Sequence, residues 1–223
     1  MKGIVLFLCL GSVRAADLRD DERRIRESAA VLSEILHAPD RGIPRDLIRK
    51  AYCVGVVPNL KRAGFVVGAK YGKGVVTCRT PGMGWSAPSV IRIEGGSFGF
   101  QIGLGETDLV FTVMNSRGMQ RLTKDKFTVG GDASAMAGPV GRSTQATTDA
   151  SMNAEILSWS RSRGLFAGVS LEGATLRPDN ANNDRLYGRP VRQGDLIHGR
   201  VRPTPAARPL FDELNRWAPV KRV

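Results

Sequence analysis

The feature that most constrains the fold of this chain is a series of short apolar runs, rich in valine and glycine, between residues 52 and 114. Stretches typical of turns separate these runs. Parallel strands need crossover connections of about a dozen residues or more, and the spacing leaves no room for them. The runs therefore predict an antiparallel sheet. They are YCVGVV, GFVVGAK, GVVTCR, SVIRIEGGSFGFQIG and DLVFTVM, and the turn-like stretches are PNLKRAG, KYGKG and TPGMG.

Helices are expected on both sides of this strand-rich region. Apolar residues recur at three-, four- and seven-residue spacing over 18–37, interleaved with charges, which predicts an amphipathic helix ended by Pro39 and Gly42. Pro44 suits the first turn of a second, short helix. The segment 205–218 predicts a helix that closes the chain.

The region between the strand-rich runs and the C-terminal helix is expected to contain both helices and strands. SRGMQRLTK predicts a short helix, AEILSWSRS and LFAGVSLEGATL predict two more strands, and DNANNDRLYG predicts a loop or short helix. No repeat or interdomain linker interrupts the pattern, and 223 residues suit one hydrophobic core. The prediction is a single α+β domain with an antiparallel, glycine-rich β core, curled or barrel-like, N-terminal amphipathic helices and a C-terminal helix.

The first residues, MKGIVLFLCLGSVRA, have the character of an export signal. A lysine precedes an apolar run over 4–10, and the stretch that ends at Ala15 suits signal peptidase. The run is far shorter than the ~18 apolar residues of a membrane span. We therefore expect a signal peptide over 1–15 and a domain over 16–223, exported to the periplasm or envelope of a bacterium and peripheral to the membrane; an uncleaved start is the alternative.

Two cysteines, Cys53 and Cys78, lie in the expected mature chain. In an exported protein such a pair suggests a disulfide, which would stabilise the fold by roughly 3–4 kcal/mol. Two buried free thiols are the alternative. The sequence contains no CxxC pair or cysteine–histidine cluster, so we expect no metal site and no cofactor.

The chain carries a formal net charge of +12. Acidic and basic residues balance over 17–50, and the basic excess is strong from residue 184 to the end. A basic surface attracts anionic lipid, nucleic acid or acidic protein, and charge alone does not choose among them. Nucleic acid is not expected, because the basic residues are not interleaved with aromatic ones and because export argues against it.

One short motif suggests catalysis. GGSFG, residues 95–99, matches the G-x-S-x-G pattern with Ser97 as the nucleophile, but that motif needs a helix after its strand, and FGFQIG continues as a strand. The candidate bases are His37, at a helix end, and His198, in a predicted short apolar strand. We therefore expect no enzyme, and a serine hydrolase is the remote alternative.

Two glycine-rich stretches invite phosphate binding. GAKYGKG, residues 68–74, lacks the spacing and the hydroxyl residue of a phosphate loop, and it predicts a β-hairpin instead. GGDASAMAGPVGR, residues 130–142, offers backbone N–H groups to an anion, but a tight turn against the sheet is the preferred interpretation.

Several longer motifs together resemble the SYLF domain family. They are IPRDLIRKAYCVGVVPNLKRAGFVVGAKYGKGVV, GWSAPS at 84–89, GFQIGLGETDLVFTVMN, AGPVGR at 137–142, SRSRGLFAGVSLEG at 160–173 and YG at 187–188. The resemblance implies a lipid-binding module. Eukaryotic members bind phosphoinositides and other anionic lipids, partly through an amphipathic N-terminal segment, and some bind actin.

The resemblance is not complete. This chain contains no SH3 or zinc-finger segment, and its N-terminal helix is charge-balanced, not basic. We therefore expect anionic phospholipid or phosphoinositide-like headgroups as ligands, and we doubt that actin binding carries over. The alternative function is an interaction or structural protein of the envelope whose basic face docks an acidic protein partner.

The residues expected to bind lipid lie at predicted turns or strand ends. They are Lys61, Arg62, Lys70, Lys73, Arg161 and Arg163, with Phe166 as an apolar contact. Leu32, Ile35 and Leu36 are further apolar candidates on the amphipathic helix, although such positions more often belong to a core. Each cation near an anionic surface contributes roughly 1 kcal/mol, so several contacts give reversible binding.

Overall fold

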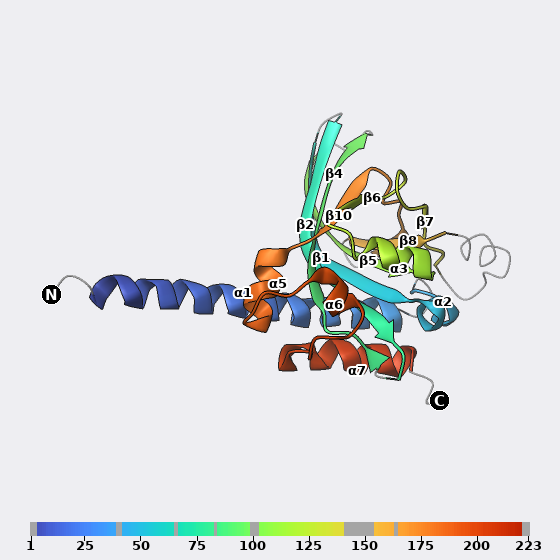
Figure 1. Cartoon of the computed structure of the whole chain (residues 1–223). Coiled ribbons are helices and arrows are strands. Elements are labelled where there is room, and N and C mark those ends of the chain that lie inside the picture. Colours follow the sequence, from blue (N-terminus) through green and yellow to red (C-terminus); the bar gives the residue numbers. More distant parts are fainter. Residues whose placement is uncertain are drawn as a thin grey trace.

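Figure 1 shows the computed structural model, which describes residues 4–38, 42–64, 67–82, 84–98, 103–140, 154–162 and 165–219. In chain order its elements are α1 (Ile4–His37), α2 (Arg45–Lys50), β1 (Cys53–Gly64), β2 (Val67–Thr80), β3 (Gly84–Trp85), β4 (Ser89–Phe98), β5 (Gly103–Val113), α3 (Ser116–Arg121), β6 (Phe127–Thr128), β7 (Ala135–Ala137), β8 (Ile156–Ser162), β9 (Leu165–Gly168), β10 (Ala174–Pro178), α5 (Asn180–Tyr187), α6 (Gln193–Ile197), the 3-10 turn η1 (Pro205–Ala207) and α7 (Arg208–Trp217).

One curled sheet forms the centre of the molecule. Its strands follow the order β6-β10-β4-β2-β1-β5-β8-β7, with β3 beside β2 and β9 beside β8. The pairings between these strands are antiparallel, except that β7 runs parallel to β8. The predicted α+β fold with an antiparallel core is confirmed.

Two hydrophobic cores lie on the two faces of the sheet, because successive strand residues point to opposite sides. On one side, which we call the helix face, Val54 and Val56 of β1 belong to a core with residues of α1, α2 and α7. On the other side, the opposite face, Val57 and Leu60 of β1 pack with residues of β4, β5 and β10 and with Leu122 after α3.

The helix α1 runs across the base of the sheet with α7 beside it, and its N-terminal part extends beyond the rest of the molecule (Figure 1). Its apolar stripe is buried: Leu32 and Ile35 are fully buried and Leu36 nearly so. The predicted helix over 18–37 is confirmed, and the observed helix begins earlier and passes Ala15 without a break. No helix among the described residues is long and apolar enough to span a bilayer.

Two predicted turns are wrong, because β1 and β2 each continue through them. In PNLKRAG the chain makes a bulge, with Asn59 at a φ of 52° and a register shift between Val57 and Leu60. In KYGKG the strand stays extended, so the predicted hairpin at residues 68–74 is also wrong. A Cβ at Gly74 would lie 2.1 Å from the carbonyl oxygen of Val56, so glycine serves close strand packing there, not a turn.

Two other local predictions need correction. The single strand predicted over 165–176 is divided into β9 and β10, with Gly173 at a φ of 76° in the turn before β10. His198 is not in a strand; it follows the last turn of α6, where its backbone N–H donates to Gly194. The predicted helices at α2, α3 and α7 are confirmed, and DNANNDRLYG forms the helix α5.

Candidate functional site

The outer ends of β1 and β2 extend past the bulge and away from the helices (Figure 1). We call this segment, residues 60–64 and 67–72, the distal ribbon. Four of the six cations proposed from the sequence lie in or next to it, and three of them, Lys61, Arg62 and Lys70, belong to it.

Arg62 of β1 lies directly opposite Lys70 of β2. Directly opposed residues point to the same face of a sheet, with Cβ atoms about 5 Å apart, and like charges in such a pair repel each other. The strand alternation from Leu60 places both cations on the opposite face, away from α1. Their outer neighbours in the same row are Gly105 of β5 and Gly95 of β4, which have no side chains to shield them.

Neither cation is paired with a carboxylate in the part of the chain that the structure describes. Among the described residues, no ion pair or hydrogen bond involves the side chain of Arg62 or Lys70, and the buried Nε of Arg62 has no acceptor. Burial lowers the pKa of Lys70 below its ordinary value, and the neighbouring Arg62 guanidinium lowers it further. The ribbon therefore holds two part-buried positive charges side by side with no anion between them.

The other face of the ribbon has a different character. Lys61 and Tyr71 are cross-strand partners there, and both are exposed, Tyr71 to 45%. Tyrosine combines an apolar ring with a polar tip and suits the boundary between water and lipid headgroups. The ribbon thus presents a cation pair on one face and a lysine–tyrosine pair on the other, where Glu106 of β5 is opposite Lys61 and Glu94 of β4 is opposite Tyr71.

Glycines continue the ribbon toward its tip. Gly64 is paired with Gly68 on one side and with Gly103 on the other, and Gly68 is paired with Ser97. Ser97 therefore lies inside a run of paired strand residues, and β5 is the next described element after β4. This is not the strand-turn-helix geometry of a nucleophile elbow.

Lys73 serves a different purpose from Lys70. Its Nζ lies 2.8 Å from Oδ2 of Asp179, the residue that caps the N-terminus of α5. Asp179 is buried, and Arg92 of β4 approaches the same oxygen at 3.8 Å. Lys73 thus fixes a helix to the sheet and is not available to a ligand while that ion pair is intact.

Arg161 is also held by carboxylates. Its Nε donates to Oδ2 of Asp108 at 2.8 Å, and its Nη1 forms an ion pair with Glu34 of α1. The other oxygen of Asp108 accepts the backbone N–H of Asn59 in the β1 bulge, so the Asp108 carboxylate of β5 joins β1 to β8. The guanidinium lies 6.0 Å from the ring centroid of Phe166. Phe166 is itself buried, and Arg163 lies outside the described residues.

Cys53 and Cys78 form a disulfide. They are directly opposed in the β1–β2 pair, at the end nearest the helices. The bond joins the two strands there, while the ribbon lies at their other end.

The sequence identified the ribbon cations Lys61, Arg62 and Lys70, but it did not separate them from Lys73 and Arg161, which are held by carboxylates. Asp108, Glu34 and Asp179 were not expected to neutralise Arg161 and Lys73, because these partners lie far away in the sequence. Tyr71 was also missed, since KYGKG was assigned to a turn. The described residues contain no group of histidine, cysteine and carboxylate side chains that could hold a metal ion.

Comparison with known proteins places the chain in a family. Residues 94–217 match the family model described as "Ysc84: Las17-binding protein actin regulator". The chain is similar to the SH3 domain-containing YSC84-like protein 1 of Rattus norvegicus, with 37% identity over 195 residues, 86% of this chain and 56% of that protein. It is also similar to the LAS seventeen-binding protein 3 of Saccharomyces cerevisiae, with 37% identity over 182 residues, 80% of this chain and 39% of that protein.

These relatives extend beyond the shared region, since the chain spans about half the length of the YSC84-like proteins and less of the yeast protein. At 86% coverage of this chain, the match to the rat protein includes β1 and β2, which carry the distal ribbon, whereas the family model begins within β4 at residue 94. The sequence resemblance, the family model and the relatives agree: this chain belongs to the Ysc84 family, the family of SYLF domains.

Proposed function

We propose that this domain binds anionic phospholipid headgroups at a membrane surface, and that the distal ribbon makes the contact. The observation that carries the proposal is the pair of Arg62 and Lys70, which face each other with no carboxylate among the described residues. Two opposed cations cost stability, whereas an anion between them would be bound by both.

The chemistry of the pair suits a phosphate group. A guanidinium offers several N–H donors in a fixed plane, and a lysine ammonium adds a point charge. Glycines at the neighbouring positions leave the backbone open to a bulky headgroup. A phosphoinositide-like headgroup, which carries phosphomonoester groups, is the finer form of this proposal.

The shape of the ribbon also favours a surface. It extends away from the helices, so a planar membrane can approach its tip without meeting α1 or α7 (Figure 1). Lys61 and Tyr71 on the helix face would then contact headgroups from the other side of the ribbon. Cations on an anionic surface contribute about 1 kcal/mol each, so the expected binding is reversible and salt-dependent.

The proposed role is binding without catalysis, in an exported, oxidising compartment. The Cys53–Cys78 disulfide and the apolar first residues of the chain support this location. A test is the oxidation state of these two cysteines in protein taken directly from cells. Reduced thiols together with an uncleaved N-terminus would contradict export.

The membrane proposal is tested by vesicle flotation. The probes are phosphatidylcholine vesicles alone, vesicles that also contain phosphatidylglycerol, and vesicles that contain a phosphatidylinositol phosphate at the same total charge. We expect recovery only with anionic vesicles. Stronger recovery with the phosphoinositide at equal charge supports the finer form, and equal recovery contradicts it.

A matched pair of variants identifies the contact. Arg62→Gln/Lys70→Gln removes two charges from the ribbon. The free energy of partition should become less favourable by about 2 kcal/mol, which lowers the partition coefficient roughly thirtyfold. Arg202→Gln/Arg208→Gln removes two exposed charges near α7, at the other end of the molecule, and should change partition little. Equal losses in both variants would show a diffuse charge effect and contradict membrane contact through the ribbon.

Charge-dependent capture of an acidic protein with no vesicle binding would favour the alternative function, which is docking of a protein partner.

A further inference from the structure

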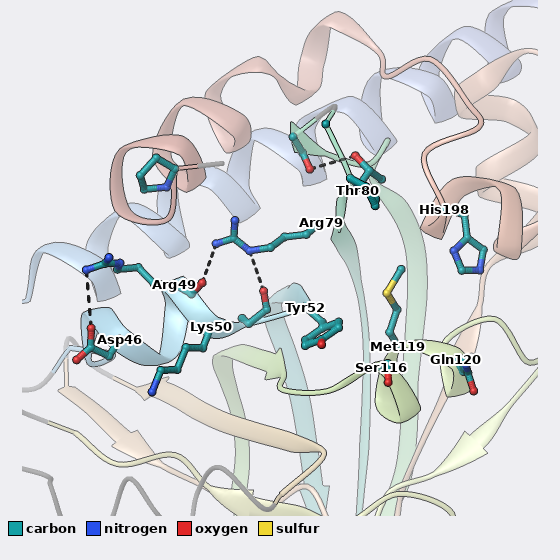
Figure 2. Close-up of a pocket in the computed structure, with 15 residues that line it drawn as sticks. Asp46, Arg49, Lys50, Tyr52, Arg79, Thr80, Ser116, Met119, Gln120 and His198 are labelled. Carbon is teal, nitrogen blue, oxygen red and sulfur yellow. Dashed lines mark hydrogen bonds and ion pairs between the residues drawn. The ribbon is translucent and has the colours of Figure 1, made fainter. Parts of the chain in front are cut away.

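A second site lies at the end of β1 and β2 nearest the helices. A pocket of about 850 Å³ opens there between α2, Tyr52 just before β1, the end of β2, α3 and His198 just after α6 (Figure 2). Its volume is within the range of sites that enclose a small organic ligand. Residues 73–78 of β2 lie between the distal ribbon and Arg79, the nearest lining residue on that strand, which is about 20 Å of extended chain, so the two sites are distinct.

One wall of the pocket is apolar. Tyr52, just before β1, and Met119 of α3 both line it (Figure 2), and Pro81 and Pro219 also belong to the lining. Tyr52 is 42% exposed although its neighbours Ala51 and Cys53 are fully buried. A large ring left open beside a buried strand indicates a surface that a ligand can cover.

The other wall is basic and is organised around Arg79. Its Nε donates to the carbonyl oxygen of Ala51 at 2.9 Å and its Nη2 to that of Arg49 at 3.1 Å, which Figure 2 shows as dashed lines. The guanidinium also stacks on the ring of Trp85, 4.7 Å from the centroid. These contacts fix the group in place but supply no negative charge.

In the described part of the chain, no carboxylate pairs with Arg79. The two hydrogen bonds use two of the five N–H donors of the guanidinium, which leaves donors for a further acceptor. Burial lowers the pKa of Arg79 from its ordinary value, because desolvation disfavours the charged form. The one carboxylate that lines the pocket, Asp46, pairs with Arg49 at 3.9 Å.

We propose that this pocket binds an amphiphile with a single anionic group and an aliphatic chain, with the anionic group at Arg79 and the chain along Tyr52 and Met119. A fixed cation beside apolar lining residues matches a ligand with one charge and a long apolar body. The proposal does not depend on lipid binding at the distal ribbon.

Isothermal titration with sodium dodecanoate below its micelle concentration tests this site. We expect saturable binding with one molecule per chain, at least tenfold tighter than that of acetate, which has the charge without the chain. Dodecan-1-ol, which has the chain without the charge, should also bind at least tenfold more weakly. Absence of saturable binding, or binding of the alcohol as tight as that of dodecanoate, overturns the proposal.

Three variants locate the ligand. Met119→Trp narrows the apolar wall without a change of charge, Met119→Gln makes it polar at similar size, and Arg79→Gln removes the cation. Each should weaken dodecanoate binding about tenfold or more. Thermal unfolding shows which variants are folded. Because Met119 is only partly buried at the edge of the core, its two variants test the site even if Arg79→Gln does not fold.

A fourth variant separates this proposal from the function proposed above. Arg62→Gln/Lys70→Gln should lose vesicle binding and retain dodecanoate affinity, because it leaves the pocket intact. Unchanged dodecanoate affinity in both Met119 variants, or loss of that affinity in the ribbon variant, overturns the pocket site whatever the vesicles show.

Discussion

Near the helices, the cations of the sheet are held by buried carboxylates: Arg161 by Asp108, and Lys73 by Asp179. On the distal ribbon of the same sheet, Arg62 and Lys70 face each other, and no carboxylate among the described residues approaches them. The first arrangement attaches α1 and α5 to the sheet. The second makes no such attachment among the described residues, and the proposed function assigns it to a negatively charged ligand, because like charges placed together lower the stability of a fold.

This contrast separates two roles that the sequence alone presents as one. A basic residue in a strand contributes to stability when a carboxylate from a distant segment reaches it, and it is available for binding when none does. Stability and vesicle binding should therefore respond in opposite ways to substitutions in the two regions. The following measurements use that difference.

The largest effect on stability is expected from the disulfide, which closes a loop of 25 residues in the region near the helices. Cys53→Ser/Cys78→Ser should lower the free energy of unfolding by about 3–4 kcal/mol, since the unfolded chain gains freedom. Denaturant unfolding of oxidised protein and variant measures the difference. Vesicle binding by the folded variant should be unchanged, and a stability loss below about 1 kcal/mol would argue against the role given to this bond.

The same substitution in the two regions gives the sharpest comparison. Arg161→Gln leaves the buried Asp108 without its cation, so it should cost about 3 kcal/mol of unfolding free energy. Arg62→Gln removes a repulsion instead, and its stability should stay within about 0.5 kcal/mol of the parent or rise.

Chemical denaturation of both variants, together with their partition to anionic vesicles, decides this comparison. Arg161→Gln should keep its vesicle binding while folded, and Arg62→Gln should lose part of it. Similar stability losses for the two variants would contradict the division into two regions.

A change of pH should have a smaller effect on stability and on vesicle binding. Burial and Arg62 lower the pKa of Lys70 below its ordinary value of 10.5, so in the folded protein this lysine loses its proton at a lower pH than in the unfolded chain. Between the lowered pKa and 10.5 the native state binds fewer protons, and stability rises with pH across that window. Vesicle binding should fall over the same window, because the ribbon loses a charge.

Lys70→Arg tests this interpretation, because a guanidinium keeps its charge throughout that window. The variant should retain vesicle binding at alkaline pH where the parent loses it, as measured by flotation across a pH series. An identical pH profile for the two proteins would show that another group titrates.

The sequence predicts the general architecture well, because it depends on local pattern. The alternation of residues in β1 and the apolar stripe of α1 directly predict a sheet and the helix that covers it. The bulge at Asn59 and the straight course of β2 through Gly74 could not be predicted, because they depend on how closely neighbouring strands approach. Local composition at both places is equally typical of a turn.

The candidate site was predicted only in part for a similar reason. Lys61, Arg62 and Lys70 were identified as basic positions, but nothing local separates them from Lys73 or Arg161. The carboxylate that reaches Arg161 is 53 residues away, and the one that reaches Lys73 is more distant still. Pairing over such separations is decided by the tertiary fold.

Amide hydrogen exchange with and without anionic vesicles is the most direct test of membrane binding by the ribbon, because it reports which segment a membrane covers. We expect added protection in peptides from the distal ribbon, residues 60–64 and 67–72, and no change in peptides from β8, which contain Arg161. The ribbon variant Arg62→Gln/Lys70→Gln should lose that protection. Protection confined to α1, or to β8 and its neighbours, with the ribbon unchanged, would contradict the account.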